Sequence, residues 1–233
     1  MRGGPSGEKL GFGGAADARR TPPHRPGFIN RRGEASRPTM RAFFAVDLPD
    51  DLAPAVADAQ APFADAPGVN PVDPEQAHVT LKFCGDVAES DGDSPRDTPA
   101  VDDVIEAGER AVDRAGVAPF EAAVGGLGVF PNREYVSVVW AGVGRGGDDL
   151  AALHEALEAE TTALGVDPAD HGFTPHVTLG RVENATGADA VRDALDAEDP
   201  AVGTFSVGEI RLIESTLTPS GPEYDAVRVF GLD

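Results

Sequence analysis

Hydrophobic and polar residues follow two periods along the chain, one of about two residues and one of about 3.6. Runs with the shorter period, or with crowded β-branched residues, predict strands at 41–48, 69–72, 76–83, 120–129, 135–143, 173–182, 203–207, 209–217 and 224–230. Helical spacing of apolar residues predicts helices at 49–63, 101–115, 150–164 and 188–195. An acidic stretch with Ser and Pro at 85–98 is interpreted as an exposed loop. This succession of elements predicts an α+β fold.

Two of the predicted strands contain the same tetrad. His78-Val79-Thr80-Leu81 and His176-Val177-Thr178-Leu179 start 98 residues apart. Alternate side chains of a strand share a face, so His and Thr should point one way and Val and Leu into the core. A lone histidine in a strand is usually structural, but two copies in matching contexts favour a shared role. Two similar lobes, each offering one tetrad to a common cleft, would account for the spacing.

The residue types in the tetrads suit proton transfer at a phosphate. An imidazole can take or give a proton near neutral pH, and a hydroxyl two residues on can donate a hydrogen bond to an oxyanion. Cleavage of a phosphodiester needs one group to accept a proton from the attacking oxygen and another to protonate the leaving oxygen. Two opposed imidazoles meet that need without a metal, so we expect neither a metal nor another cofactor.

The composition is acidic in an unusual way. The formal net charge is −21, and Lys9 and Lys82 are the only lysines. Such a composition is typical of proteins from salt-loving organisms. An acidic protein ordinarily avoids nucleic acid, but at about 1 M salt the Debye length is roughly 3 Å, so only contact charges count.

The single cysteine, Cys84, excludes an intrachain disulfide and a cysteine-based zinc site, which favours a cytoplasmic protein. No apolar run approaches the roughly 20 residues that span a bilayer, and no apolar signal core is present at the start. We therefore expect no membrane partner.

Residues 1–39 differ from the rest of the chain. They contain eight basic and three acidic residues with several Gly and Pro, whereas residues 40–233 contain 11 basic and 37 acidic residues. We interpret 1–39 as a disordered basic extension, or as sequence upstream of a true start at Met40, and 40–233 as the folded domain. The functional alternative is a basic arm that touches RNA.

Beyond the tetrads, several segments resemble one known family. The chain resembles the 2H phosphoesterase superfamily, specifically the RNA 2',3'-cyclic phosphodiesterases formerly described as 2'-5' RNA ligases. The resembling segments are 40–45, 127–131, 139–143, 173–176, 212–217 and 221–224. The likeness covers residues 40 to about 230, and the loop at 85–98 looks longer than is usual in the family.

The resemblance implies a bilobal duplicated fold with antiparallel sheets, helices on the outer faces and a pseudo-two-fold cleft between the lobes. It also implies metal-independent opening of terminal 2',3'-cyclic phosphates to 2'-phosphates. Carried onto this chain, His78 would be the proton donor and His176 the proton acceptor. Thr80 and Thr178 would bind the phosphate oxygens. The partners would be RNA ends, including tRNA fragments, and the protein is expected to be a monomer.

Few cations are available to bind the phosphate. Lys82 lies two residues after Thr80 and should share its face, whereas Arg181, three after Thr178, should point away unless a bulge at Gly180 re-aims it. For both, the alternative is an ordinary surface charge. Arg133 is a further candidate for the phosphate. Phe44 and Phe130 are candidates for base stacking, although a core position is the simpler interpretation.

Three other patterns have weaker support. Gly142–Gly147 fits G-x-G-x-x-G, but no second strand precedes the acid expected for dinucleotide binding, so a flexible turn is favoured. Asp167, Asp170, His171 and His176 match no strong metal signature. His154, on a predicted helix, is interpreted as structural.

Two alternative functions stay open. The same residues would serve 2'-5' ligation of tRNA halves, which only product analysis separates from hydrolysis. A non-catalytic RNA-end binding module is disfavoured, because binding alone needs no paired acid and base.

Overall fold

The computed structural model describes residues 39–88, 98–219 and 221–233. The predicted extension at 1–39 therefore lies outside the described residues, apart from Thr39, where the first strand begins. Residues 89–97 of the predicted loop also lie outside them. Among the described residues, no helix is both long enough and apolar enough to cross a membrane.

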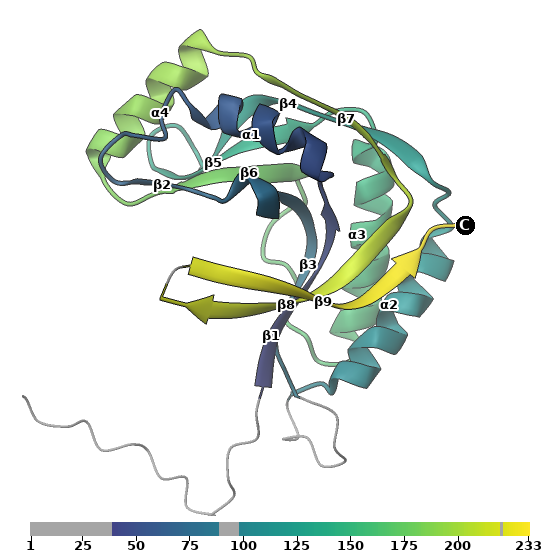
Figure 1. Cartoon of the computed structure of the whole chain (residues 1–233). Coiled ribbons are helices and arrows are strands. Elements are labelled where there is room, and N and C mark those ends of the chain that lie inside the picture. Colours follow the sequence, from purple (N-terminus) through teal and green to yellow (C-terminus); the bar gives the residue numbers. More distant parts are fainter. Residues whose placement is uncertain (1–38, 89–97, 220) are drawn as a thin grey trace, which may run out of the picture. The chain divides into compact units, whose positions relative to one another are not determined.

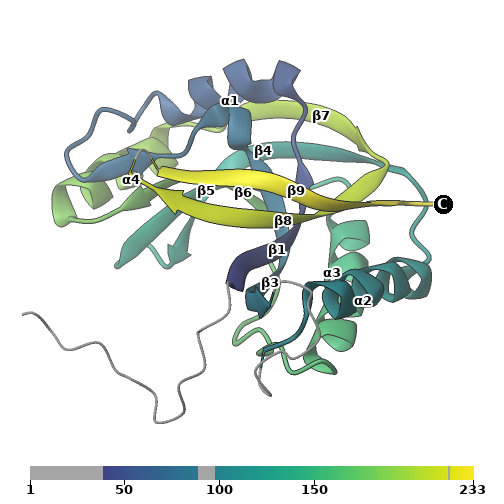
Figure 2. The same ribbon diagram turned by 60° about the horizontal axis from the view of Figure 1, so that its bottom comes forward.

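All nine strands of the described residues belong to one mainly antiparallel sheet (Figures 1 and 2). They are β1 (Thr39–Asp47), β2 (Val69–Pro71), β3 (His78–Ala88), β4 (Phe120–Pro131), β5 (Val136–Val143), β6 (His176–Val182), β7 (Ala201–Val207), β8 (Glu209–Thr218) and β9 (Gly221–Gly231). The order across the sheet is β7-β4-β5-β6-β3-β1-β8-β9, with β2 beside β6. The sheet curls into a half-barrel, and the predicted α+β class with antiparallel strands is confirmed.

The two strands that carry the tetrads, β3 and β6, meet at the centre of this order. Their ladder contains one residue pair, Val79 with Val177. Three further strands continue the sheet on each side of that pair, so each half contributes one tetrad at the junction. A pseudo-two-fold relation between the halves stays a prediction.

Helices cover the outer face of both halves (Figure 1). They are α1 (Ala53–Gln60), α2 (Val101–Ala115), α3 (Gly147–Thr162) and α4 (Ala185–Ala197), with short 3-10 turns at Asp50–Leu52 and Pro74–Gln76. Helices α2 and α3 pack on each other and on β9 and β3, whereas α1 packs on β6 and β7, and α4 packs on β5. A second, smaller buried cluster consists of Phe43, Ala45 and Ile213, with Tyr224 packed against it.

Helix α2 shows how the pattern of the sequence becomes packing. Its buried stripe follows helical spacing and includes Val101, Val104 and Ala111. A Cβ at Gly108 would lie 2.7 Å from the Phe44 ring and 2.8 Å from the Phe230 ring, so only glycine lets the helix approach the sheet this closely. The helix ends at Gly116, whose φ of +57° is the left-handed conformation common at such ends.

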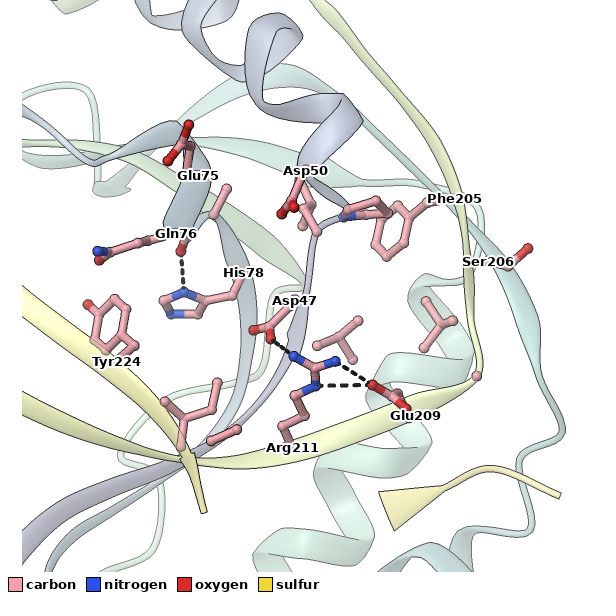
Figure 3. A pocket seen from close by; sticks show the side chains of 18 residues that line it. Asp47, Asp50, Glu75, Gln76, His78, Phe205, Ser206, Glu209, Arg211 and Tyr224 are labelled. Carbon is pink, nitrogen blue, oxygen red and sulfur yellow. Dashed lines mark hydrogen bonds and ion pairs between the residues drawn. The ribbon is translucent and has the colours of Figure 1, made fainter. Parts of the chain in front are cut away.

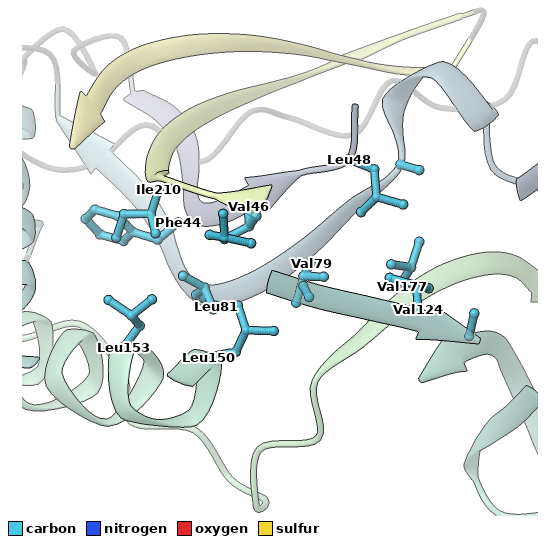
Figure 4. Close-up of a cluster of buried hydrophobic side chains, with 14 of the residues drawn as sticks. Phe44, Val46, Leu48, Val79, Leu81, Val124, Leu150, Leu153, Val177 and Ile210 are labelled. Atoms are coloured by element: carbon cyan, nitrogen blue, oxygen red, sulfur yellow. The ribbon is translucent and has the colours of Figure 1, made fainter. Parts of the chain in front are cut away.

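The apolar residues of both tetrads face the core (Figure 4). Val79, Val177 and Leu179 are fully buried, and Leu81 is 2% exposed. Leu150 and Leu153 of α3 cover the same cluster. Burial of one such aliphatic side chain contributes about 1.5–3 kcal/mol, so this layer holds the tetrad strands firmly from behind.

Some element boundaries differ from those that the pattern predicts. β3 continues to Ala88, through the start of the predicted loop, because residues 85–88 pair with the first residues of β1. β4 continues through Pro131, where a turn was expected, because that residue still pairs with Val136. α4 begins earlier than predicted because Asn184 accepts a hydrogen bond from the Gly187 amide and caps it.

Candidate active site

Four side chains of the tetrads meet on the inner face of the sheet. Because Val79 pairs with Val177 in antiparallel strands, the residues beside one valine lie across from those beside the other. His78 is therefore opposite Thr178, and Thr80 is opposite His176. All four are partly exposed, whereas both valines are fully buried. The structure thus places both histidines and both threonines on one face, on the two strands that adjoin at Val79 and Val177.

The imidazole of His78 is held by one hydrogen bond and two rings. Nδ1 donates to the Gln76 carbonyl oxygen at 2.8 Å, which leaves Nε2 free for proton transfer. Phe43 lies 5.1 Å from the imidazole between ring centroids, and Tyr224 meets it edge-on at 5.2 Å. Burial lowers the pKa of His78, while the bond to Gln76 and the charge of Asp47 act in the opposite direction.

His176 has a matching arrangement. Nδ1 donates to the Thr174 carbonyl oxygen at 2.7 Å, again two residues upstream, so Nε2 is again free. Phe130 meets the imidazole edge-on at 5.0 Å, and Trp140 lies 5.9 Å away between ring centroids. Burial lowers the pKa of His176, the bond to Thr174 raises it, and the charges of His78 and His171 lower it further. The charge of His78 is therefore close enough to His176 to affect its protonation.

Lys82 does not join this group, contrary to the prediction. Two consecutive residues of β1 pair with Thr80 and Lys82, so Leu81 between them is an extra residue, a β-bulge. The bulge turns Lys82 to the helix side, where it is 4% exposed. Its Nζ donates to the Asp167 carbonyl oxygen at 2.8 Å and lies 2.8 Å from Glu158 Oε2.

A second bulge at the same place in the other tetrad has the opposite result for Arg181. Two consecutive residues of β5 pair with Thr178 and Gly180, which leaves Leu179 as the extra residue. Gly180 is buried, and the exposed Arg181 is returned to the inner face. Burial raises the pKa of Tyr224, and the charge of Arg181 opposes that shift, so the guanidinium lies near the ring that touches His78.

Helix α3 fastens the segment that leads into His176. Glu158 accepts a hydrogen bond from the Ala169 amide at 2.7 Å, besides its ion pair with Lys82. Burial acts to raise the pKa of Glu158, but Lys82 and the Ala169 amide hold it below its ordinary value. His154 donates from Nδ1 to the Leu81 carbonyl oxygen at 2.7 Å and stacks on Phe173 at 4.3 Å. His154 thus has the structural role that was predicted: it links α3 to β3 and to the segment before β6.

The other candidate residues lie apart from the histidines or play other parts. Phe44 is fully buried against Phe230, as the core interpretation predicted. Phe130 is at the site, edge-on to His176. Arg133 donates to Asp196 of α4 at 2.5 Å. Among the described residues, no three His, Cys, Asp or Glu side chains gather as a metal-binding group, so the set around His171 is not assembled.

A hollow of about 790 Å³ opens beside His78 (Figure 3). His78 and Tyr224 line it, but His176 does not, so this hollow borders only one of the two imidazoles. On the far side of His78, Arg211 donates to Asp47 at 2.8 Å and to Glu209 at 2.6 Å. This arginine is satisfied by carboxylates, which leaves Arg181 as the better-placed cation for an anion between the histidines.

Sequence patterns did not identify the aromatic residues that contact the imidazoles, chiefly Phe43, Tyr224 and Trp140. Each is on a different strand from the histidine that it touches, and no local pattern links them. All three residues lie in segments that resemble the family, which was the available signal. The resemblance did not indicate that they contact the histidines.

Comparison with known proteins gives one consistent picture. The model of the 2'-5' RNA ligase superfamily matches residues 48–218. A protein of Methanothermobacter thermautotrophicus named RNA 2',3'-cyclic phosphodiesterase is 36% identical over 83% of this chain and 99% of its own length. A protein of the same name from Thermus thermophilus is 32% identical over 83% of this chain and 90% of its own.

Solved structures agree in fold. TT0787 of Thermus thermophilus superposes with a TM-score of 0.63 at 29% identity, covering 83% of this chain and 98% of that one. E. coli LigT complexed with 3'-AMP superposes with a TM-score of 0.64 over 84% of this chain and 99% of that one. At 22% identity, the second likeness supports the fold alone.

Proposed function

Because the chain belongs to the 2'-5' RNA ligase superfamily, we propose that it hydrolyses the terminal 2',3'-cyclic phosphates of RNA to 2'-phosphomonoesters. The observation that carries the proposal is the pairing of Val79 with Val177, which sets two His-x-Thr faces against each other. The names of the relatives support this substrate class.

In the proposed reaction, His176 acts as the base. Its free Nε2 takes a proton from water as the water oxygen attacks phosphorus. The bond from phosphorus to the 3' oxygen breaks, and Nε2 of His78 gives that oxygen its proton. Thr80 and Thr178 donate hydrogen bonds to the non-bridging oxygens, and Arg181 offsets the negative charge that develops there.

The surroundings of the two imidazoles support this assignment of acid and base. The charge of Asp47 favours the protonated form of His78, as a proton donor requires. His176 instead feels the positive charges of His78 and His171, which favour its neutral form. The reverse assignment would put the base beside the Asp47 carboxylate, which favours the protonated form that a base must not have.

The proposal predicts that His78→Ala and His176→Ala each lose nearly all turnover. Removal of a general acid or base typically costs about 10²- to 10⁴-fold in rate. The assay is hydrolysis of an RNA oligonucleotide with a 2',3'-cyclic phosphate end, in high KCl with EDTA, and the product is identified. His171→Ala is the comparison variant: this exposed histidine lies outside the tetrads, so its loss should leave turnover largely intact and only remove the effect of its charge on the pKa of His176.

Near wild-type rate in either tetrad variant would defeat the scheme, and so would loss of wild-type activity in EDTA. Addition of an RNA with a 5'-hydroxyl tests the ligation alternative. If a 2'-5'-joined product forms in place of the 2'-phosphate, the chain is a ligase.

A further inference from the structure

An exposed phenylalanine continues the inner face beyond the tetrad of β3. Phe83 is 68% exposed, an unusual exposure for such a large apolar side chain. The bulge at Leu81 turns Lys82 outward, so the next residue, Phe83, returns to the face that carries His78 and Thr80. The bulge therefore extends the active-site face with an aromatic ring.

This ring is linked to the catalytic histidine through one other ring. Phe83 lies 6.0 Å from Phe43, and Phe43 lies 5.1 Å from His78, between ring centroids. Phe43 is 4% exposed, so its faces are covered, whereas Phe83 offers its own surface to solvent. Two residues separate Phe83 from Thr80, so the ring lies at most about 10 Å along the strand from that threonine, beside the reacting phosphate.

A cation lies one step farther in the same direction. On β1, Arg41 precedes Phe43 by two residues and therefore shares its face. The Arg41 side chain is 77% exposed, and its Nε lies 4.0 Å from Asp86 Oδ1, the limit of an ion pair. Arg211 on the neighbouring strand is held by two carboxylates, whereas Arg41 keeps its guanidinium mostly in solvent.

We propose that Phe83 and Arg41 form a subsite for the nucleotide that precedes the cyclic-phosphate end of the RNA. Its base stacks on the exposed face of Phe83, and its phosphate meets Arg41. An aromatic ring accepts any base, because every base has a π-face. The chain is strongly acidic and has few cations that could bind a phosphate. Arg41 lies beyond the ring on the inner face, so it is the residue that a second phosphate would meet. The inference rests on the proposed hydrolysis and adds to it a preference for RNA longer than one nucleotide.

The test compares a 2',3'-cyclic mononucleotide with a trinucleotide that ends in the same cyclic phosphate. We expect Phe83→Ala to raise KM for the trinucleotide roughly 5- to 100-fold, the usual worth of one stacked base, and to leave KM for the mononucleotide unchanged. Phe83→Trp should restore the trinucleotide KM, and Phe83→Leu should not. Tyr135→Ala is the matched control, because Tyr135 is 71% exposed on the turn before β5.

Arg41→Gln tests the phosphate contact. For the trinucleotide, the slope of log kcat/KM against log salt concentration should become shallower by about 0.7, the contribution of one contact to a single strand. The mononucleotide slope should stay as in the wild type.

The subsite and the proposed function fail in different ways. A wild type that cleaves neither substrate overturns the function. A wild type that cleaves both, with variants that leave the ratio of the two kcat/KM values unaltered, overturns the subsite alone. An equal rise in KM for both substrates in Phe83→Ala would assign the ring to the terminal base and overturn the position proposed here.

Discussion

At the scale of the residue, the catalytic proposal depends on which imidazole nitrogen is free. In both histidines, Nδ1 donates to a carbonyl two residues upstream, which fixes the tautomer and leaves Nε2 without a proton in the neutral form. Aromatic rings then restrict rotation of each imidazole. Neither effect needs a charged partner, so both groups stay available for proton transfer.

Burial of the two histidines predicts an acidic pH optimum. The pKa of each is lowered from an ordinary value of 6.5. The base must be neutral, so activity is lost as pH falls through the pKa of His176. The acid must be charged, so activity is lost as pH rises through the pKa of His78. A plot of kcat/KM against pH should be a bell with its maximum below 6.5, and a maximum on the alkaline side would contradict the lowered values.

At the scale of the element, the repeated bulge decides what each tetrad strand presents. The extra residue is the leucine of both tetrads, so the residue after it is buried and the next one faces the site. In β3 these two residues are Lys82 and Phe83, and in β6 they are Gly180 and Arg181. The same backbone irregularity thus leaves a buried lysine in one half and an exposed arginine on the inner face in the other.

The bulges predict different results for the same kind of substitution. Arg181→Met should lower kcat/KM roughly 10- to 100-fold, as expected for a lost bond to a charged group, without a change in thermal midpoint. Lys82→Met should instead lower the free energy of unfolding by about 2–4 kcal/mol, because Glu158 loses its ion pair. Enzyme kinetics and denaturant unfolding of both variants provide the check. The assignment is wrong if Lys82→Met unfolds like the wild type.

At the scale of the whole molecule, the candidate active site lies where β3 and β6 join the two halves of the sheet. Each half also contains segments from distant parts of the sequence. Strand β2 and helix α1 come before β3 in the chain but pack on β6, whereas α3 precedes β6 but packs on β3. The site and the fold are therefore coupled. The chain as a whole is strongly acidic, with a formal net charge of −21.

The charge predicts that salt stabilises the protein. Mutual repulsion of the carboxylates destabilises the compact state, and it is screened as the Debye length falls from about 10 Å at 0.1 M to about 3 Å at 1 M salt. The thermal midpoint should rise over a KCl series and should rise in the same way with NaCl. If the thermal midpoint does not depend on ionic strength, the protein is not adapted to salt in the way that its composition indicates.

Much of the fold was readable from local pattern. The spacing of α2 predicted its bounds, Val101–Ala115, as observed. The two-residue period of each tetrad predicted that the valines face the core. The motifs also predicted the family, which the relatives confirm. These features depend on neighbouring residues in one strand or helix, so the sequence carries them directly.

The pairing of distant strands decided the rest. Lys82 was expected to share the face of Thr80, but pairing with β1 inserts a bulge before it. Pairing with β5 likewise turns Arg181 inward. Tyr224 contacts His78 from a strand near the end of the chain. A side chain's face follows from period two only while the ladder is regular, and only the tertiary structure shows where that regularity breaks.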